Sequence, residues 1–74
     1  MDEQLFIDTV AEVFQVDGNS LSLETTQEEI PEWDSFAHLN LLMKLSEISS
    51  IDLDPDKIAE LLTLKDIYAF FTKS

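Results

Sequence analysis

The stretch that decides the fold is residues 30–45, IPEWDSFAHLNLLMKL. Pro31 favours extended backbone at the residue before it and has no N–H to donate, so the segment before the tryptophan is expected to be loop. Ser35 suits a helix N-cap, because its hydroxyl can accept from an unpaired N–H of the first turn. From Phe36 onward, apolar residues cover most of a helical circumference. The stretch predicts a central helix, packed on several sides, that ends near residues 49–50.

A first helix is predicted over residues 3–16. Its inward stripe recurs every four positions and consists of Phe6, Val10 and Phe14. Asp2 is placed to cap this helix. Gly18 and Asn19 tolerate the left-handed backbone that helix ends use, so the chain is expected to leave the helix at residues 17–20.

Two more helices are predicted after the central one. Asp54-Pro55 has the form of a helix start, a cap followed by proline, and opens a short helix over residues 56–62. Thr63 then begins the last helix, with Asp66 three residues on as in a capping box. The apolar face of the last helix is Leu64, Ile67, Tyr68 and Phe71. The lysines expected in solvent are Lys65 and Lys73.

Residues 17–34 form a long polar connection, in which a short helical turn is expected at residues 26–29. A loop of this length in a small domain is expected to be pinned to the core or functional. Its apolar anchors are Leu21, Leu23, Ile30 and Trp33. The tryptophan is expected to cover the end of the bundle, with direct contact to a bound partner as the lesser alternative. The fold class is therefore all-α, a small four-helix bundle of three main helices and a short third one, in a single domain over residues 1–74.

Composition narrows the possible functions. The 74 residues include 16 acidic side chains against four lysines, no arginine and no cysteine, and the formal net charge is −12. Such a charge repels nucleic acids, favours a monomer and attracts partners with basic surfaces. Without cysteine the chain has no disulfide, no zinc–thiolate site and no thiol of its own. The acidic start is unlike a signal peptide, and no apolar run approaches about 20 residues, so a cytoplasmic protein without a membrane span is expected.

Residues 33–42, WDSFAHLNLL, resemble the attachment motif of the acyl carrier protein family, in which Asp-Ser-Leu opens the second helix. The resemblance extends over nearly the whole chain and implies the same four-helix architecture. It implies that Ser35 carries 4′-phosphopantetheine, whose thiol holds an acyl or aminoacyl group as a thioester. Asp34 and Phe36 would belong to the motif recognised by a phosphopantetheinyl transferase that uses coenzyme A and Mg²⁺. Phe36 stands where leucine is usual, and Ser49 and Ser50 stand where many members have an aromatic residue and glycine.

The resemblance also implies partners and a place for the cargo. The partners would be an acyl- or aminoacyl-loading ligase and downstream transferases with basic docking surfaces. The expected partner face on the central helix is Ala37, His38, Asn40, Lys44 and Glu47. This face is less acidic than in typical fatty-acid carriers, which favours a specialised biosynthetic pathway. The residues that could line a cargo cavity, or simply form the core, are Leu39, Leu42, Met43, Ile58, Leu61 and Leu62.

Other chemistry fits less well. Asp34, Ser35 and His38 are the residue types of a hydrolytic triad, but no strand is expected before the serine and no Gly-x-Ser-x-Gly elbow contains it, so no enzyme is expected. His38 is expected at the surface or its boundary, with contact to the phosphate of the prosthetic group as the lesser alternative. EF-hand loops started at Asp17 or Asp52 lack the required glycine, so no specific metal site is predicted. The alternative function is an unmodified acidic helical module that binds basic proteins.

Overall fold

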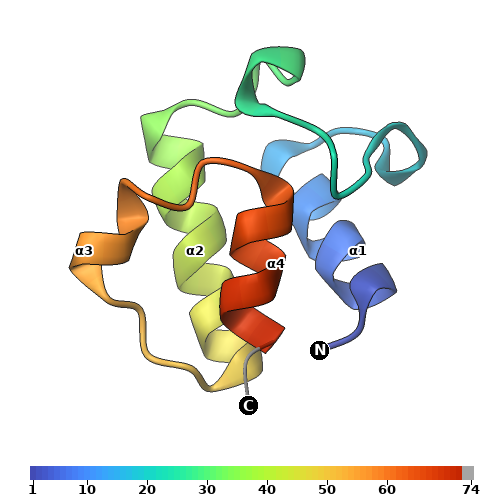
Figure 1. Cartoon of the computed structure of the whole chain (residues 1–74). Coiled ribbons are helices and arrows are strands. Elements are labelled where there is room, and N and C mark those ends of the chain that lie inside the picture. Colours follow the sequence, from blue (N-terminus) through green and yellow to red (C-terminus); the bar gives the residue numbers. More distant parts are fainter. Residues whose placement is uncertain (73–74) are drawn as a thin grey trace.

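The computed structural model describes residues 1–72, which contain four α-helices joined by loops (Figure 1). The helices are α1 (Glu3–Phe14), α2 (Ser35–Ser49), α3 (Pro55–Ile58) and α4 (Leu64–Thr72). No strand forms within these residues, and a single isolated β-bridge joins Thr26 to Thr63. The predicted all-α class, with three main helices and a short third one, is confirmed. The expectation for Lys73 lies outside the described residues.

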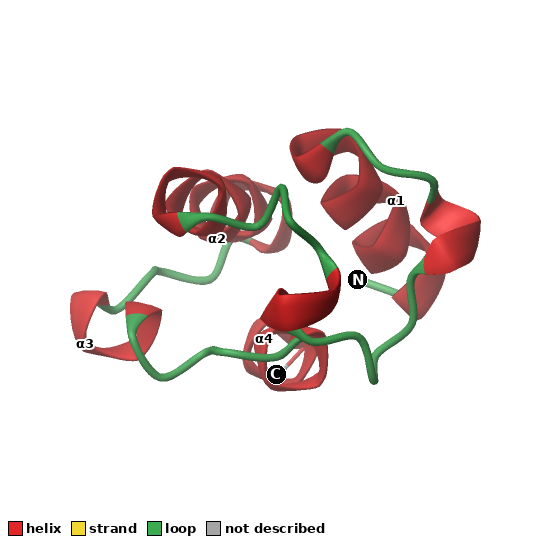
Figure 2. Cartoon of the chain, turned by 90° about the horizontal axis from the view of Figure 1, so that it is seen from above, coloured by secondary structure: helices red, strands yellow, loops and turns green. Residues whose placement is uncertain are grey.

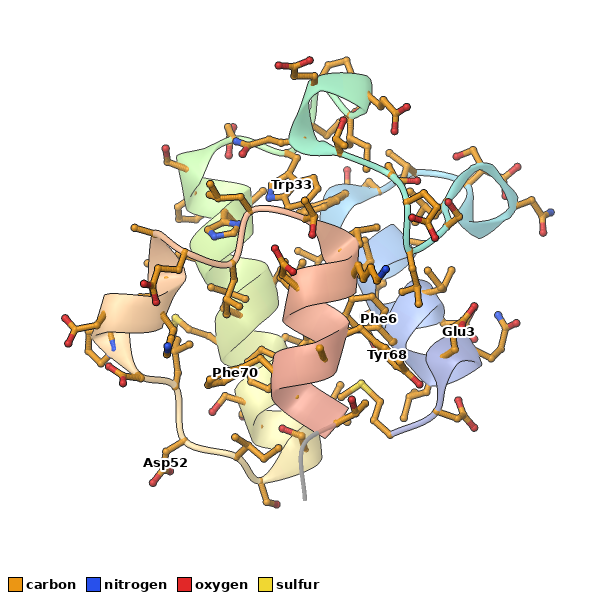
Figure 3. All side chains as sticks on the ribbon, in the orientation of Figure 1. Glu3, Phe6, Trp33, Asp52, Tyr68 and Phe70 are labelled. Carbon is orange, nitrogen blue, oxygen red and sulfur yellow. The ribbon has the colours of Figure 1, made fainter. Side chains whose placement is uncertain are left out.

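The core lies between α1, α2 and α4. Side chains without exposed surface come from all three of them: Phe6, Val10, Leu41, Leu42, Leu45, Leu64 and Ile67. Phe6 also meets Tyr68 of α4 with ring centroids 5.1 Å apart (Figure 3). Burial of each large apolar side chain contributes about 1.5–3 kcal/mol. Figure 2 shows these three helices around the core, whereas α3 lies apart, on the side of α2 away from α1.

Helix α2 ends where the sequence predicts, and α1 does not. α2 ends at Ser49 as predicted, and Ser50 has the left-handed backbone at φ 59°. α1 ends at Phe14, two residues earlier than predicted, because Gln15 rather than a later glycine or asparagine adopts the left-handed conformation, at φ 57°. The Gln15 N–H donates to the Ala11 carbonyl and closes the last turn. Gly18 instead opens a separate 3₁₀ turn, Gly18–Ser20.

The long connection between α1 and α2 is pinned to the core, as expected. Ile30 and Trp33 are buried, and the Trp33 ring packs on Phe14 of α1 with centroids 5.4 Å apart. Figure 3 shows Trp33 under this connection at one end of the bundle. A 3₁₀ turn, Gln27–Glu29, lies where a short helical turn was predicted. The connection therefore leads directly from the core to the start of α2.

The short helix α3 is less regular than predicted. It spans Pro55–Ile58 instead of residues 56–62, and Asp54 caps it by accepting from the Asp56 N–H at 3.0 Å. The chain then turns, because the N–H groups of Glu60 and Leu61 both donate to the Lys57 carbonyl at 3.0 Å. No residue of α3 itself is buried. A helix of one turn closes too few hydrogen bonds to be stable alone, so its position depends on contacts with the rest of the fold.

Candidate functional site at the start of helix α2

The start of α2 is capped by Asp34, and the prediction that Ser35 is the N-cap is wrong. Asp34 has extended backbone, and its Oδ1 accepts from the Ala37 N–H at 2.8 Å. The Asp34 carbonyl accepts from the His38 N–H at 2.8 Å, which closes the first turn. A carboxylate at this place also interacts favourably with the positive end of the helix. Ser35 is consequently the first helical residue, and capping makes no demand on its hydroxyl.

The Ser35 hydroxyl is exposed and, within residues 1–72, has no intramolecular hydrogen bond. Asp34 accepts from the N–H groups of Ala37 and His38. The N–H groups of Ser35 and Phe36 have no acceptor in the same part of the chain. Unpaired N–H groups and the helix dipole favour a negative group at this end. The carboxylates of Glu32 and Asp34 are exposed nearby and oppose it in part. The serine is thus accessible to a reagent and lies in a local field that accepts a phosphate.

Phe36 is the most exposed large apolar residue, with 74% of its surface accessible. Leu39 and Met43 are also exposed, at 40% and 53%, although the sequence placed them inside as candidates for a cargo cavity. Apolar residues cover most of the α2 circumference, but α1 and α4 cover only one face of it. The spacing i, i+3, i+7 aligns these three side chains along the helix, whereas Ile48, which is also exposed, lies off this line. We call Phe36, Leu39 and Met43 the apolar stripe.

His38 is buried, with 8% of its surface exposed, and the expectation of a surface or boundary position is wrong. Its Nδ1 lies 2.9 Å from Trp33 Nε1, and its Nε2 lies 2.8 Å from the Ile58 carbonyl oxygen. The indole N–H can only donate and the carbonyl can only accept, so the imidazole is neutral with its proton on Nε2. We call this hydrogen-bonded set, Trp33, His38 and the Ile58 carbonyl, the histidine bridge. It links the long connection, α2 and α3.

An open cleft of about 320 Å³ lies beside the serine. Its walls come from the long connection, α2 and the α3 region: Gln27, Ser35, His38, Ile58, Ala59 and Leu62. A second groove, of about 580 Å³, shares Gln27 and Leu62 with this cleft and continues along residues 26–33. The Gln27 side-chain amide donates to the Trp33 carbonyl at 3.1 Å, which fixes it against the connection. No sequence pattern pointed to Gln27, because the path of the long connection has no periodicity to follow.

The six residues considered for a cargo cavity divide three ways. Ile58 and Leu62 line the cleft beside the serine. Leu42 and Leu61 are buried in the core, so for these two the alternative of plain core packing is the correct one. Leu39 and Met43 face outward in the apolar stripe. The space next to Ser35 is therefore a surface cleft whose apolar wall comes from the α3 side.

No family model, curated protein or solved structure matches this chain. The functional interpretation therefore relies on the geometry at the start of α2 and on the motif in residues 33–42.

The five residues of the predicted partner face differ in exposure. Asn40, Lys44 and Glu47 are exposed and Ala37 is half-buried, whereas His38 points inward and offers nothing to a partner. The Lys44 ammonium lies 3.9 Å from the Glu12 carboxylate of α1, and both side chains are largely exposed. Such a pair contributes at most about 1 kcal/mol. The apolar stripe, which the sequence analysis missed as a surface, is the larger uncovered feature of α2.

Asp34, Ser35 and His38 are not arranged as a hydrolytic triad. Asp34 uses Oδ1 for the helix cap, and both ring nitrogens of His38 are bonded to Trp33 and Ile58. Neither side chain is hydrogen-bonded to the Ser35 hydroxyl. Within residues 1–72 no group of three or more His, Cys, Asp or Glu side chains is arranged to hold a metal ion. In the same residues no helix has both the length and the apolar character needed to cross a bilayer.

Proposed function

We propose that this chain is a carrier protein of the acyl carrier type, modified at Ser35 with 4′-phosphopantetheine. The observation that carries the proposal is the exposed hydroxyl on the first residue of α2, which makes no bond within the described residues. The motif in residues 33–42 adds the resemblance to known carriers. The chain is then the substrate of a transferase and has no catalytic role of its own.

The modification is a phosphoryl transfer from coenzyme A. The Ser35 oxygen bonds to the phosphorus next to the pantetheine, the pyrophosphate bond breaks and 3′,5′-ADP leaves. The hydroxyl proton passes to a base of the transferase, whose Mg²⁺ neutralises charge on the pyrophosphate. The serine must enter the site of that enzyme, and its position at an exposed helix start supports such access. A substrate of the transferase needs no base of its own, which agrees with His38 having both ring nitrogens hydrogen-bonded to Trp33 and Ile58.

The residues around Ser35 fit the group. The phosphodiester would lie next to the two unpaired N–H groups of Ser35 and Phe36 at the positive end of α2. The pantetheine has amide and apolar parts, and the adjacent cleft offers both polar and apolar side chains, Gln27 and Leu62 among them. When bound, the group supplies the thiol that the chain lacks, since the sequence has no cysteine. Its cargo would be an acyl or aminoacyl group held as a thioester, in a specialised biosynthetic pathway.

The decisive experiment is an intact-mass measurement after incubation with coenzyme A, Mg²⁺ and a broad-specificity phosphopantetheinyl transferase. We expect a gain of one phosphopantetheine for the natural chain and none for Ser35→Ala. The matched control is Ser50→Gly, which changes the exposed serine beyond the other end of α2 and suits its left-handed backbone. This control should gain the same mass as the natural chain. No gain by the natural chain refutes the proposal.

The apolar stripe favours a second function, an interaction module that needs no prosthetic group. Phe36, Leu39 and Met43 are uncovered side by side, and the two charges of α2, on Lys44 and Glu47, cancel. The whole net charge of −12 therefore comes from outside this helix. A partner that covers α2 would meet an apolar surface surrounded by acidic ones. Binding of unmodified protein to a partner, unchanged in Ser35→Ala, would support this function in place of the first.

A further inference from the structure

The short helix α3 makes few contacts with the rest of the fold. Within the described residues, the bond between His38 and the Ile58 carbonyl joins residues 54–62 to α2, and the isolated β-bridge between Thr26 and Thr63 joins the chain directly after them to the long connection. The apolar contacts come from Ile58, which is half-buried, and from Leu61 after the helix, which is buried. The position of α3 against α2 therefore depends on few contacts, and the hydrogen bond among them that joins α3 to α2 comes from a histidine one turn after Ser35.

The same part of the chain forms a wall of the cleft beside the serine. Ile58, Ala59 and Leu62 face Ser35 and His38 across this cleft. If α3 moved away from α2, this wall would move with it, and the serine would stand at an open helix end. The hydrogen bond of His38 to Ile58 is short, 2.8 Å, and joins residues 20 positions apart. The width of the cleft is therefore linked to the state of the histidine bridge.

We propose that His38 is a positioning residue for Ser35: through the histidine bridge it holds α3 in the place that forms the cleft beside the serine. The inference rests on the proposed function, because the cleft matters for whatever is attached to Ser35. The two bonds of the bridge have separate tasks. The bond from Nε2 to Ile58 holds α3, and the bond from Trp33 to Nδ1 fixes the ring in the tautomer that can donate to Ile58.

Two variants separate these tasks. In His38→Gln the amide nitrogen lies about where Nε2 was, so it keeps a donor for the Ile58 carbonyl and loses the acceptor for Trp33. In His38→Asn the shorter amide stays near the Nδ1 position, so it keeps an acceptor for Trp33 and loses the bond to Ile58. The chain contains one histidine and one tryptophan, so each of their ring signals is assigned without ambiguity by NMR.

The first measurement needs no modification of the protein. Backbone order parameters of residues 55–61 should stay near 0.85 in the natural chain and in His38→Gln, and fall below about 0.6 in His38→Asn. The indole N–H of Trp33 should show the opposite pattern, with exchange at least about tenfold faster in His38→Gln only. In the natural chain, the nitrogen shifts of the imidazole should show the proton on Nε2. Equal order of α3 in both variants, or a proton on Nδ1, overturns the proposal even if one variant folds poorly.

The second measurement is the rate of modification with coenzyme A and the broad-specificity transferase. If the wall of the cleft is in place for only about a tenth of the time, the KM for the carrier rises about tenfold, while kcat is unchanged. We expect this in His38→Asn, with KM in His38→Gln restored to near the natural value. The same KM in both variants contradicts the positioning role. If the natural chain itself is not modified, the proposed function fails, and the order parameters alone decide the role of the bridge.

Discussion

The cap of α2 leads to a prediction that separates two neighbouring residues. Because Asp34 rather than Ser35 accepts from the Ala37 N–H, Asp34→Ala removes the cap, whereas Ser35→Ala leaves it intact. Loss of an N-cap costs about 0.5–2 kcal/mol, and loss of a negative charge at the helix start costs about 0.3–1 kcal/mol. These two effects overlap, so we expect Asp34→Ala to lower the free energy of unfolding by about 1–2 kcal/mol. Ser35→Ala should change it by less than about 0.5 kcal/mol, because the side chain is exposed and unbonded.

The expected loss is large for a domain of this size. At about 0.05–0.15 kcal/mol per residue, 74 residues have a total stability of about 4–11 kcal/mol. In a domain of 60–100 residues each 1 kcal/mol shifts Tm by about 4–8 °C, so Asp34→Ala should lower Tm by about 4–16 °C. Asp34→Asn keeps the accepting oxygen and removes the charge, so it should lose only the helix-dipole part, about 0.3–1 kcal/mol.

The assay is urea unfolding at equilibrium, followed by the fluorescence of Trp33, the single tryptophan, which is buried in the fold. All three variants should keep the slope of the natural chain, since the surface exposed on unfolding is the same. An equal loss of stability in Ser35→Ala and Asp34→Ala would refute the assignment of the cap. So would an Asp34→Ala variant as stable as the natural chain.

Three further predictions follow from burial and charge. Leu42→Ala leaves a cavity in the core and should lower the free energy of unfolding by about 2–5 kcal/mol, whereas Met43→Ala should lower it by less than about 1 kcal/mol. Similar losses for the two variants in urea titrations would contradict the outward position of Met43. Trp33→Phe leaves His38 Nδ1 without its donor, which should lower the free energy of unfolding by about 1–3 kcal/mol. A double-mutant cycle with His38→Leu should show a coupling energy of this size, and additive losses would exclude the bond. Because the net charge is −12, Tm should rise by about 5 °C between 10 and 500 mM NaCl as repulsion is screened, and calorimetry showing a fall would refute dominant self-repulsion.

Periodicity predicted the helices well because each of them has a face that the core covers. The residues at four-residue spacing in α1, Phe6, Val10 and Phe14, are all buried. On the predicted face of α4, Leu64, Ile67 and Phe71 are buried and Tyr68 is half-buried. α2 is different. Its apolar residues surround most of the helix, so their pattern does not tell which of them face the core. That choice depends on where α1 and α4 lie, and it left Met43 and Leu39 outside.

The candidate site was predicted in part. The exposed serine at the start of α2 follows from local signals, but Asp34 and Ser35 are both good capping residues, and propensity alone does not choose between them. The burial of His38 depends on Trp33 and on a carbonyl 20 residues further along the chain, a pairing with no local signature. The same holds for Gln27 in the wall of the cleft, since it lies in a segment without regular structure.

The most direct test of the carrier proposal is to locate the attached group by peptide mass spectrometry. After incubation with coenzyme A, Mg²⁺ and the transferase, cleavage after glutamate should release residues 33–47, a peptide that contains Ser35 and Ser46. Fragmentation should place one phosphopantetheine on Ser35 and none on Ser46, whose hydroxyl donates to the Ile51 carbonyl at 2.6 Å. An unmodified peptide, or a group found on any other residue, would contradict the account.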